Sequence, residues 1–287
     1  MSIASRTIRT EHADIAFLET SGKGMPVLLV HGNSSCKEVF RAQLESKAGE
    51  TYRMIALDLP GHGQSGDAFD PVRSYSIPGY ADLASELLHR LDIPRAAVFG
   101  WSLGGHVGLE MLHRYPGIAG VMIVGAPPFA RGLFGMMRAF NSQFDLMLAT
   151  RAKLTPREVR RFARVCLGEA TAAHFLEAIE RTDPQARPLL FRAMMRGDGA
   201  DQKRMAEQAD VPLAIVNGSE EPFARLGYLA GLSCPTLWDQ TCHVIEGAGH
   251  APFLQAPEAF NALFRRFLDD TARSERIDAR DVRRLTA

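Results

Sequence analysis

The sequence predicts an α/β fold with a mostly parallel central sheet, helices on both faces of it and an inserted helical cap. Short runs rich in Val, Ile and Leu alternate with helix-length amphipathic segments along the chain. Because these runs are apolar throughout rather than at every second position, they suit strands that are buried on both faces. The alternation stops between Ala126 and Asp210, which indicates a helical insertion.

The first strands are expected as an antiparallel pair, and the later ones as members of the parallel sheet. A helix is predicted over residues 80–91, where leucines recur at helical spacing and a proline follows at Pro94. The expected strands are 7–10 paired with 15–19, then 27–30, 54–57, 96–99, 121–124, 213–216 and 243–245.

We therefore divide the chain into an α/β core of residues 1–125 and 211–272, a helical cap of residues 126–210, and a charged C-terminal tail of residues 273–287. In the cap, the TPRE segment that begins at Thr155 has the pattern of a helix start, with proline at the first position and an acid in the first turn. The tail mixes both signs of charge, which predicts a solvated helix or a frayed end.

The composition excludes several classes of protein. Among 287 residues, 33 Lys and Arg balance 33 Asp and Glu, so no net charge attracts the chain to nucleic acid or to an anionic membrane. Hydrophobic residues make up 46%, enough for a large buried core. No apolar stretch is long enough to span a membrane, and the N-terminus lacks the pattern of an export signal. We expect a cytoplasmic protein whose four cysteines are free thiols.

The segment GWSLG, which contains Ser102, lies between the expected strand 96–99 and a helical segment that begins at Gly105. A serine on a sharp strand-to-helix turn is the arrangement that exposes a nucleophilic oxygen, and small neighbours relieve the crowding of such a turn. The motif alone is weak, because a glycine-rich turn without chemistry has the same pattern.

The segment HGNS directly follows the expected strand 27–30 and contains Asn33. A loop in this place can direct a backbone N–H at a substrate carbonyl oxygen, and a second N–H would come from Leu103. The Asn33 side chain either contacts a substrate carbonyl or serves only the turn.

His250 is the predicted base, because it lies in a short turn after the last expected strand and before the terminal helix. Its imidazole needs a carboxylate to hold it, and in this chain order the acid comes between serine and histidine. The turn after strand 213–216 offers Glu220 and Glu221. We favour Glu221, three residues beyond the glycine of that turn, while Glu220 stays open.

With these residues assembled, the sequence resembles the α/β-hydrolase superfamily over nearly the whole chain. Within it, the sequence closely resembles a metal-independent N-acyl homoserine lactone lactonase, through the segments HGNSS, DLPGHGQS, RSYSIPGYAD, FGWSLGGH, NGSEEPF and AGHAPF. The resemblance implies quorum quenching, the opening of the lactone ring of acylated bacterial signals. It implies Ser102 as nucleophile, His250 as base, Glu221 as orienting acid, and Asn33 and Leu103 in the oxyanion hole.

The predicted substrate contacts include residues of the cap, whose apolar side chains suit an acyl chain but equally the core of a helical subdomain. Phe162 stands where the resemblance leads us to expect a tyrosine. No zinc-binding HxHxDH cluster is present, so we expect neither a metal nor another cofactor. The expected partner is a small ester or lactone, and the oligomeric state is left open. The predicted substrate-binding residues are Asn33, Trp101, Phe134, Met137 and Phe162.

Other functions share this pattern. A general carboxylesterase uses the same triad, and carbon–carbon bond hydrolases and cofactor-free perhydrolases share the motifs. A ligand receptor with slow turnover on the same fold would also retain them. Enzymes of this superfamily that need an aspartate nucleophile are disfavoured by Ser102.

Overall fold

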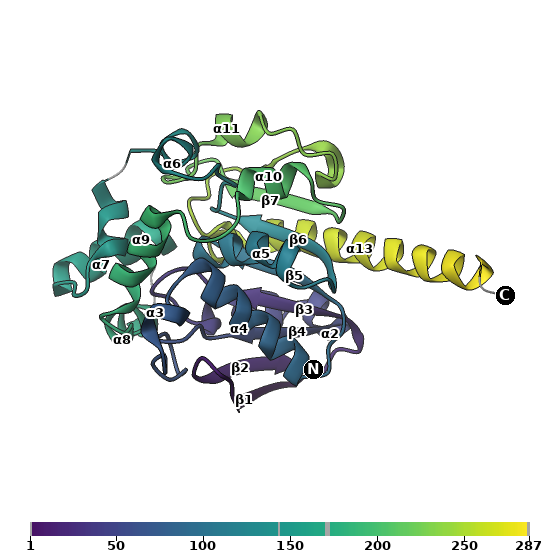
Figure 1. The fold of residues 1–287 in the computed structure, drawn as a ribbon, viewed down its shortest axis with the longest axis horizontal. Coiled ribbons are helices and arrows are strands. Elements are labelled where there is room, and N and C mark those ends of the chain that lie inside the picture. Colours follow the sequence, from purple (N-terminus) through teal and green to yellow (C-terminus); the bar gives the residue numbers. More distant parts are fainter. Residues whose placement is uncertain (1, 143, 170–172, 286–287) are drawn as a thin grey trace.

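The computed structural model describes residues 2–142, 144–169 and 173–285. In these residues a single sheet of eight strands runs through the molecule in the order β1-β2-β4-β3-β5-β6-β7-β8 (Figure 1). The strands are β1 (Ile3–Arg9), β2 (Asp14–Thr20), β3 (Gly24–Val30), β4 (Tyr52–Leu57), β5 (Ala96–Trp101), β6 (Ile118–Val124), β7 (Leu213–Gly218) and β8 (His243–Ile245).

The sheet is parallel from β4 to β8, and only β2 runs against it, since β1 is antiparallel to β2 and so has the direction of the other strands. The predicted mostly parallel sheet is therefore confirmed. Each expected strand falls inside an observed one, except the first. That strand was expected over residues 7–10, whereas β1 begins earlier, at Ile3, and ends at Arg9. The chain passes from β3 to β4 on one side and then to β5 on the other, so β3 is the point where the winding of the sheet reverses. Ligands of parallel sheets bind beside such a point, at the carboxyl ends of the strands.

Alternate residues of the central strands pack on opposite faces of the sheet. In β3, Leu28 and Val30 pack in the hydrophobic cluster that includes α4 and α5, whereas Val27 and Leu29 pack in the cluster that includes α13. Both clusters are buried, which explains why the strands are apolar at successive positions. Outside the cap the helices are η1 (Lys37–Phe40), α1 (Arg41–Leu44), α2 (Lys47–Thr51), α3 (Pro71–Ser74), α4 (Ile77–Arg90), α5 (Leu103–Arg114), α11 (Leu226–Ala230), η3 (Trp238–Gln240), α12 (Pro252–Gln255) and α13 (Pro257–Leu285).

Helices fill the described part of the chain between β6 and β7 (Figure 1). The predicted helix start at Thr155 is confirmed, because Thr155 and Glu158 form a reciprocal capping box at the beginning of α7. Figure 1 shows α7, α8 and α9 grouped at one end of the molecule. The helices of this segment are α6 (Leu133–Ala139), η2 (Phe144–Thr150), α7 (Pro156–Leu167), α8 (Ala173–Arg181), α9 (Ala186–Arg196) and α10 (Gln202–Glu207).

The C-terminal helix α13 has two parts with different surroundings. Its first turns bury Phe260, Phe264 and Phe267 against the sheet, and the helix then continues away from the body of the molecule (Figure 1). Residues 286–287 of the predicted tail lie outside the described residues. Across the part of the chain that the structure describes, none of the helices is both long and apolar enough to cross a bilayer.

Candidate active site

Ser102 occupies a strained turn between β5 and α5. Its backbone angles are φ 53° and ψ −117°, a conformation that non-glycine residues rarely adopt and that costs free energy unless the surroundings enforce it. A Cβ atom on Gly100 would collide with the carbonyl oxygen of Gly104, and one on Gly104 with that of Val30. The two glycines of the GWSLG motif are therefore sterically required, and the turn lifts Ser102 to the carboxyl edge of the sheet, as a nucleophile elbow does.

His250 and Glu221 form a buried pair across the ends of β7 and β8. His250 Nδ1 lies 2.9 Å and 2.8 Å from the two carboxylate oxygens of Glu221. Glu221 Oε1 also accepts hydrogen bonds from the backbone N–H groups of Phe223 at 2.8 Å and Ala224 at 3.1 Å. Glu220, the alternative acid, is exposed to solvent. The residue that contacts His250 is thus Glu221, the one preferred from the sequence.

The environment of Glu221 favours the ionised carboxylate. Burial alone would raise the pKa of Glu221, but the charge of His250 and the hydrogen bonds from His250 and the backbone outweigh it and hold the pKa below its ordinary value. Because an ionised carboxylate only accepts hydrogen bonds, the shared proton sits on His250 Nδ1. When the ring carries no second proton, Nε2 has a lone pair and is able to take a proton.

Three neighbours fix the position of His250. Trp101 Nε1 donates a hydrogen bond of 2.8 Å to the His250 carbonyl oxygen. The ring of Phe223 meets the imidazole edge-on, with centroids 4.8 Å apart. Gly125, at the end of β6, has φ 61°, and a Cβ there would lie 2.6 Å from His250 Nδ1. The imidazole therefore occupies space that only a glycine at residue 125 leaves open.

Ser102 and His250 line one cavity of about 50 Å³ beneath the cap. Among the described residues no hydrogen bond joins Ser102 Oγ to His250, although both side chains line the same cavity. Such bonds are often long before substrate binds and tighten in the complex. The remaining lining residues are Gly32, Asn33, Trp101, Gly125, Phe140, Leu146, Ala149, Phe162, Cys166 and Phe223.

The two predicted oxyanion-hole residues come from the start of α5 and from the loop after β3. Leu103 is the first residue of α5, where a backbone N–H has no partner within the helix. Asn33 follows β3 and lines the cavity. Its Nδ2 donates to the carbonyl oxygen of Ala149 at 3.1 Å, and its Oδ1 accepts from the Ser34 hydroxyl at 3.0 Å. The Asn33 amide thus has partners at both ends.

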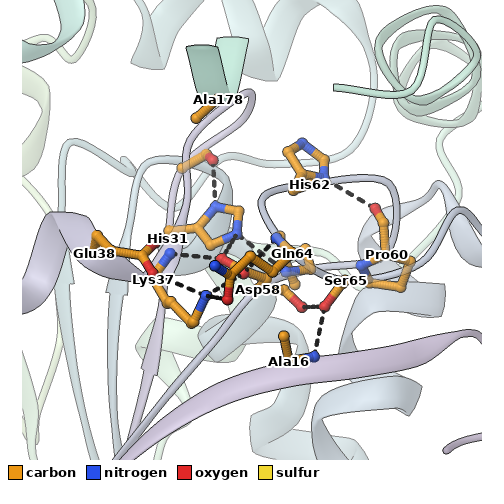
Figure 2. Close-up of polar contacts among 12 residues, drawn as sticks. Ala16, His31, Lys37, Glu38, Asp58, Pro60, His62, Gln64, Ser65 and Ala178 are labelled. Atoms are coloured by element: carbon orange, nitrogen blue, oxygen red, sulfur yellow. Dashed lines mark hydrogen bonds and ion pairs between the residues drawn. The ribbon is translucent and has the colours of Figure 1, made fainter. Parts of the chain in front are cut away.

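A buried polar network supports the loop that carries Asn33 (Figure 2). His31 Nε2 accepts a hydrogen bond of 3.0 Å from the backbone N–H of Leu59, and Nδ1 donates to Gly32. Figure 2 shows Asp58 between His31 and Lys37, and the Lys37 ammonium donates to Asp58 Oδ2 at 2.7 Å. Burial would lower the pKa of Lys37, but the negative charges of Asp58 and Glu38 raise it above its ordinary value. This ion pair ties the loop after β3 to the loop after β4.

The structure distributes the predicted substrate-binding residues over two places. Asn33, Trp101 and Phe162 line the cavity. Phe134 and Met137 lie on α6 with exposed fractions of 84% and 58%, away from it.

Sequence reasoning did not single out Leu146, Ala149, Cys166 and Phe223 as cavity residues. Phe140 belongs to the same apolar set as Phe134 in the sequence, but no periodic signal distinguishes the one that faces the cavity.

A larger cavity, of about 810 Å³, lies between the 36–45 segment and α8. It contains none of Ser102, His250 and Glu221, so we place the candidate site in the smaller cavity, where the reactive groups are. In the described ranges, no cluster of three or more His, Cys, Asp or Glu side chains is arranged to hold a metal ion.

Comparison with known proteins agrees with this architecture. The sequence profile of the "Alpha/beta hydrolase family" matches residues 27–263. Crystal structures of N-acyl homoserine lactonase AidH are 44% identical to this chain. One, a mutant complexed with N-hexanoyl homoserine, has a TM-score of 0.92 and covers 94% of this chain and 98% of that one. Another, a serine-to-glycine mutant complexed with N-hexanoyl homoserine lactone, has a TM-score of 0.91 and covers 93% and 98%.

More distant relatives share the fold or part of the sequence. The pimeloyl-[acyl-carrier protein] methyl ester esterase of Neisseria meningitidis is 29% identical, over 86% of this chain and 96% of its own length. A putative aryl esterase from Burkholderia cenocepacia, 21% identical, superposes with a TM-score of 0.75 over 93% of this chain and 99% of its own. The family profile covers most of the sheet and the whole of the cap, and the chain therefore belongs to the alpha/beta hydrolase family.

Proposed function

We propose that this protein is a metal-independent serine hydrolase that opens the lactone ring of N-acyl homoserine lactones. The observation that carries the proposal is the buried His250–Glu221 pair, which shares a cavity with the strained Ser102. The substrate class rests on the likeness to AidH, whose structures contain N-hexanoyl homoserine lactone and the ring-opened N-hexanoyl homoserine.

In the proposed reaction His250 Nε2 takes the proton of Ser102 as Oγ attacks the lactone carbonyl carbon. Glu221 stays ionised and stabilises the imidazolium that forms. The Leu103 N–H and the loop of Asn33 stabilise the negative charge that forms on the carbonyl oxygen. One such donor lowers the activation free energy by about 3 kcal/mol.

Collapse of the tetrahedral intermediate breaks the ring C–O bond, and His250 returns the proton to the leaving oxygen. The leaving alcohol stays attached to the acyl part, because both belonged to one ring. Water activated by His250 then attacks the Ser102 ester, and N-acyl homoserine is released with Ser102 regenerated. The apolar side chains of Phe140, Leu146 and Phe162 provide the wall against which an acyl chain packs.

The test is mass spectrometry of a mixed panel of N-acyl homoserine lactones incubated with the protein. We expect a gain of one water with the acyl amide intact, in many turnovers and with an unchanged rate after treatment with a chelator. Ser102→Ala should lower the rate at least about 10³-fold, with the melting temperature preserved. Release of free fatty acid, or near-normal ring opening by Ser102→Ala, would refute the proposal.

The relative from Neisseria meningitidis favours a second candidate, hydrolysis of a simple carboxylic ester. The same residues would carry it out, so the two candidates differ only in substrate. Comparison of kcat/KM for acyl homoserine lactones with that for methyl esters of the same acyl chains separates them. Tight lactone binding with negligible turnover of both would instead indicate a receptor.

A further inference from the structure

Arg187 is a cap residue whose guanidinium is buried beside the loop of Asn33. It lies on α9 with an exposed fraction of 2%. In the part of the chain that the structure describes, no carboxylate forms an ion pair with it. Burial lowers the pKa of Arg187 to about 10, so the group remains charged at neutral pH. A buried charge without a counter-ion is costly, and such groups are uncommon unless they have a specific task.

The donors of Arg187 are directed at oxygen atoms of both the cap and the core. Nη2 donates to the carbonyl oxygen of Ile179 at 2.6 Å, and Nη1 lies 3.4 Å from that of Ala152. These two contacts stay within the cap. Nε donates to Ser34 Oγ at 2.7 Å, and this bond crosses to the loop after β3. Arg187 is thereby joined to the residue that follows Asn33.

The chemistry of the groups fixes which atom donates and which accepts in each hydrogen bond of the series from Arg187 to Asn33. A guanidinium only donates, so Ser34 Oγ accepts from Arg187 and turns its own hydrogen to Asn33 Oδ1, at 3.0 Å. A carbonyl oxygen only accepts, so the Ala149 oxygen takes one Nδ2 hydrogen of Asn33. The amide therefore has one orientation. Among the described residues its second Nδ2 hydrogen has no acceptor, and Asn33 itself lines the cavity.

We propose that Arg187 is a positioning residue of the active site, which acts through Ser34 to hold the Asn33 amide with its N–H toward the substrate oxygen. The inference rests on the proposed function for its substrate, and it adds that the cap contributes to the orientation of the oxyanion loop. Ser34 has φ 61°, so it is held in a conformation that its own backbone disfavours. The bond from Arg187 is one of the contacts that offset this strain.

The test is a double-mutant cycle of Arg187→Met and Ser34→Gly. Methionine keeps the bulk of the side chain without its donors, and glycine accepts the positive φ of residue 34 while removing only the hydroxymethyl group. We measure kcat and KM with N-hexanoyl homoserine lactone and with p-nitrophenyl butyrate. Arg192→Met is the matched control, because Arg192 lies on the same helix and is exposed.

If Arg187 acts through Ser34, each single variant lowers kcat at least about tenfold, less than the loss of a whole oxyanion donor, and changes KM by less than about threefold. The double variant is then no slower than the slower single one, because both changes break one chain of bonds. Arg192→Met retains the kcat of the wild type. A merely structural Arg187 would give additive losses.

Unchanged kcat in Ser34→Gly, or additive losses in the double variant, would overturn the positioning role. If Arg187→Met fails to fold, Ser34→Gly and Arg187→Lys decide the question. Lysine retains the positive charge but not the planar set of guanidinium N–H donors. A Lys variant with full kcat therefore also contradicts the proposal. A wild type that hydrolyses the ester but not the lactone refutes only the substrate, since the ester rates still test Arg187.

Discussion

The two walls of the candidate active site are built in different ways. On the sheet side, Ser102, Glu221 and His250 lie in turns that follow β5, β7 and β8, and hydrogen bonds to backbone groups near the strand ends hold them. On the cap side, Leu146 and Phe162 reach the cavity from η2 and α7 and offer only apolar surface. The sheet side therefore supplies the reactive groups in a fixed geometry, whereas the apolar cap residues that line the cavity determine its shape.

The difference indicates that the two walls have separate functions. Parallel strands in one sheet place their carboxyl ends at a common edge, so residues far apart in the sequence meet there with little freedom. Helices that pack through apolar side chains accept changes of size and spacing more readily. We expect substitutions on the sheet side to change kcat, and substitutions of the apolar cap residues that line the cavity to change the preference among acyl chains.

The largest expected effect on the sheet side is at Glu221. In Glu221→Gln the amide no longer stabilises the imidazolium or selects the His250 tautomer, and we expect kcat to fall about 10⁴-fold, as when the acid of such a triad becomes an amide. Glu220→Gln is the matched control, because Glu220 is its exposed neighbour, and it should retain the kcat of the wild type. Steady-state kinetics on one ester measure both. A large loss in Glu220→Gln alone would transfer the role to that residue.

Because the pKa of Glu221 is lowered in the folded protein, Glu221→Gln should also change how the stability depends on pH in the acid range. A carboxyl whose pKa is lower in the folded state stabilises the fold above its unfolded pKa, about 4.3, and loses that contribution as pH falls through the folded pKa. Urea unfolding below about pH 4.3 should therefore show a smaller pH-dependent loss of stability in Glu221→Gln than in the wild type. Equal losses would mean that Glu221 is not held as a carboxylate.

A second test on the sheet side compares two glycines with positive φ. Gly125→Ala and Gly247→Ala bear similar backbone strain, at φ 61° and 70°, but only the new methyl group at 125 meets His250. Gly247→Ala should lose about 1 kcal/mol of stability, and Gly125→Ala should lose more, because its methyl group also collides with the imidazole. Displacement of the imidazole by about 1 Å should lower kcat of Gly125→Ala about 100-fold, while Gly247→Ala retains it. Comparable kcat values in the two variants would show that the place of His250 is not set by residue 125.

The sequence was sufficient to predict the sheet side of the site, because each of its parts has a local sequence pattern. Apolar runs mark the strands, and GWSLG marks the turn at Ser102 through the steric need for two glycines. The chain order of serine, acid and histidine then limits the candidates, and the spacing from the glycine favours Glu221 over Glu220. The roles of these residues stay predictions until they are tested, but their places in the fold follow from the strand ends.

The cap side and its polar links had no comparable signal. Arg187 and Ser34 are 153 positions apart, and nothing in the sequence near either residue indicates the other. The pair of Lys37 and Asp58 was missed for the same reason. Helix α6 has seven residues, too few for periodicity to show which face is buried, so Phe134 and Met137 could not be separated from residues that reach the cavity.

The smallest expected effect concerns selectivity and compares two phenylalanines of the cap. Phe162 lines the cavity and Phe134 is exposed, although both were predicted to contact substrate. Phe162→Leu should change the ratio of kcat/KM for octanoyl and butanoyl homoserine lactone by about tenfold, the scale on which apolar pockets discriminate methylene groups, with little change in kcat on a short ester. Phe134→Leu should leave the ratio unchanged. A shift in the ratio with Phe134→Leu alone would mean that α6 closes over the acyl chain during turnover, and the wall formed by Phe162 would then not set the chain preference.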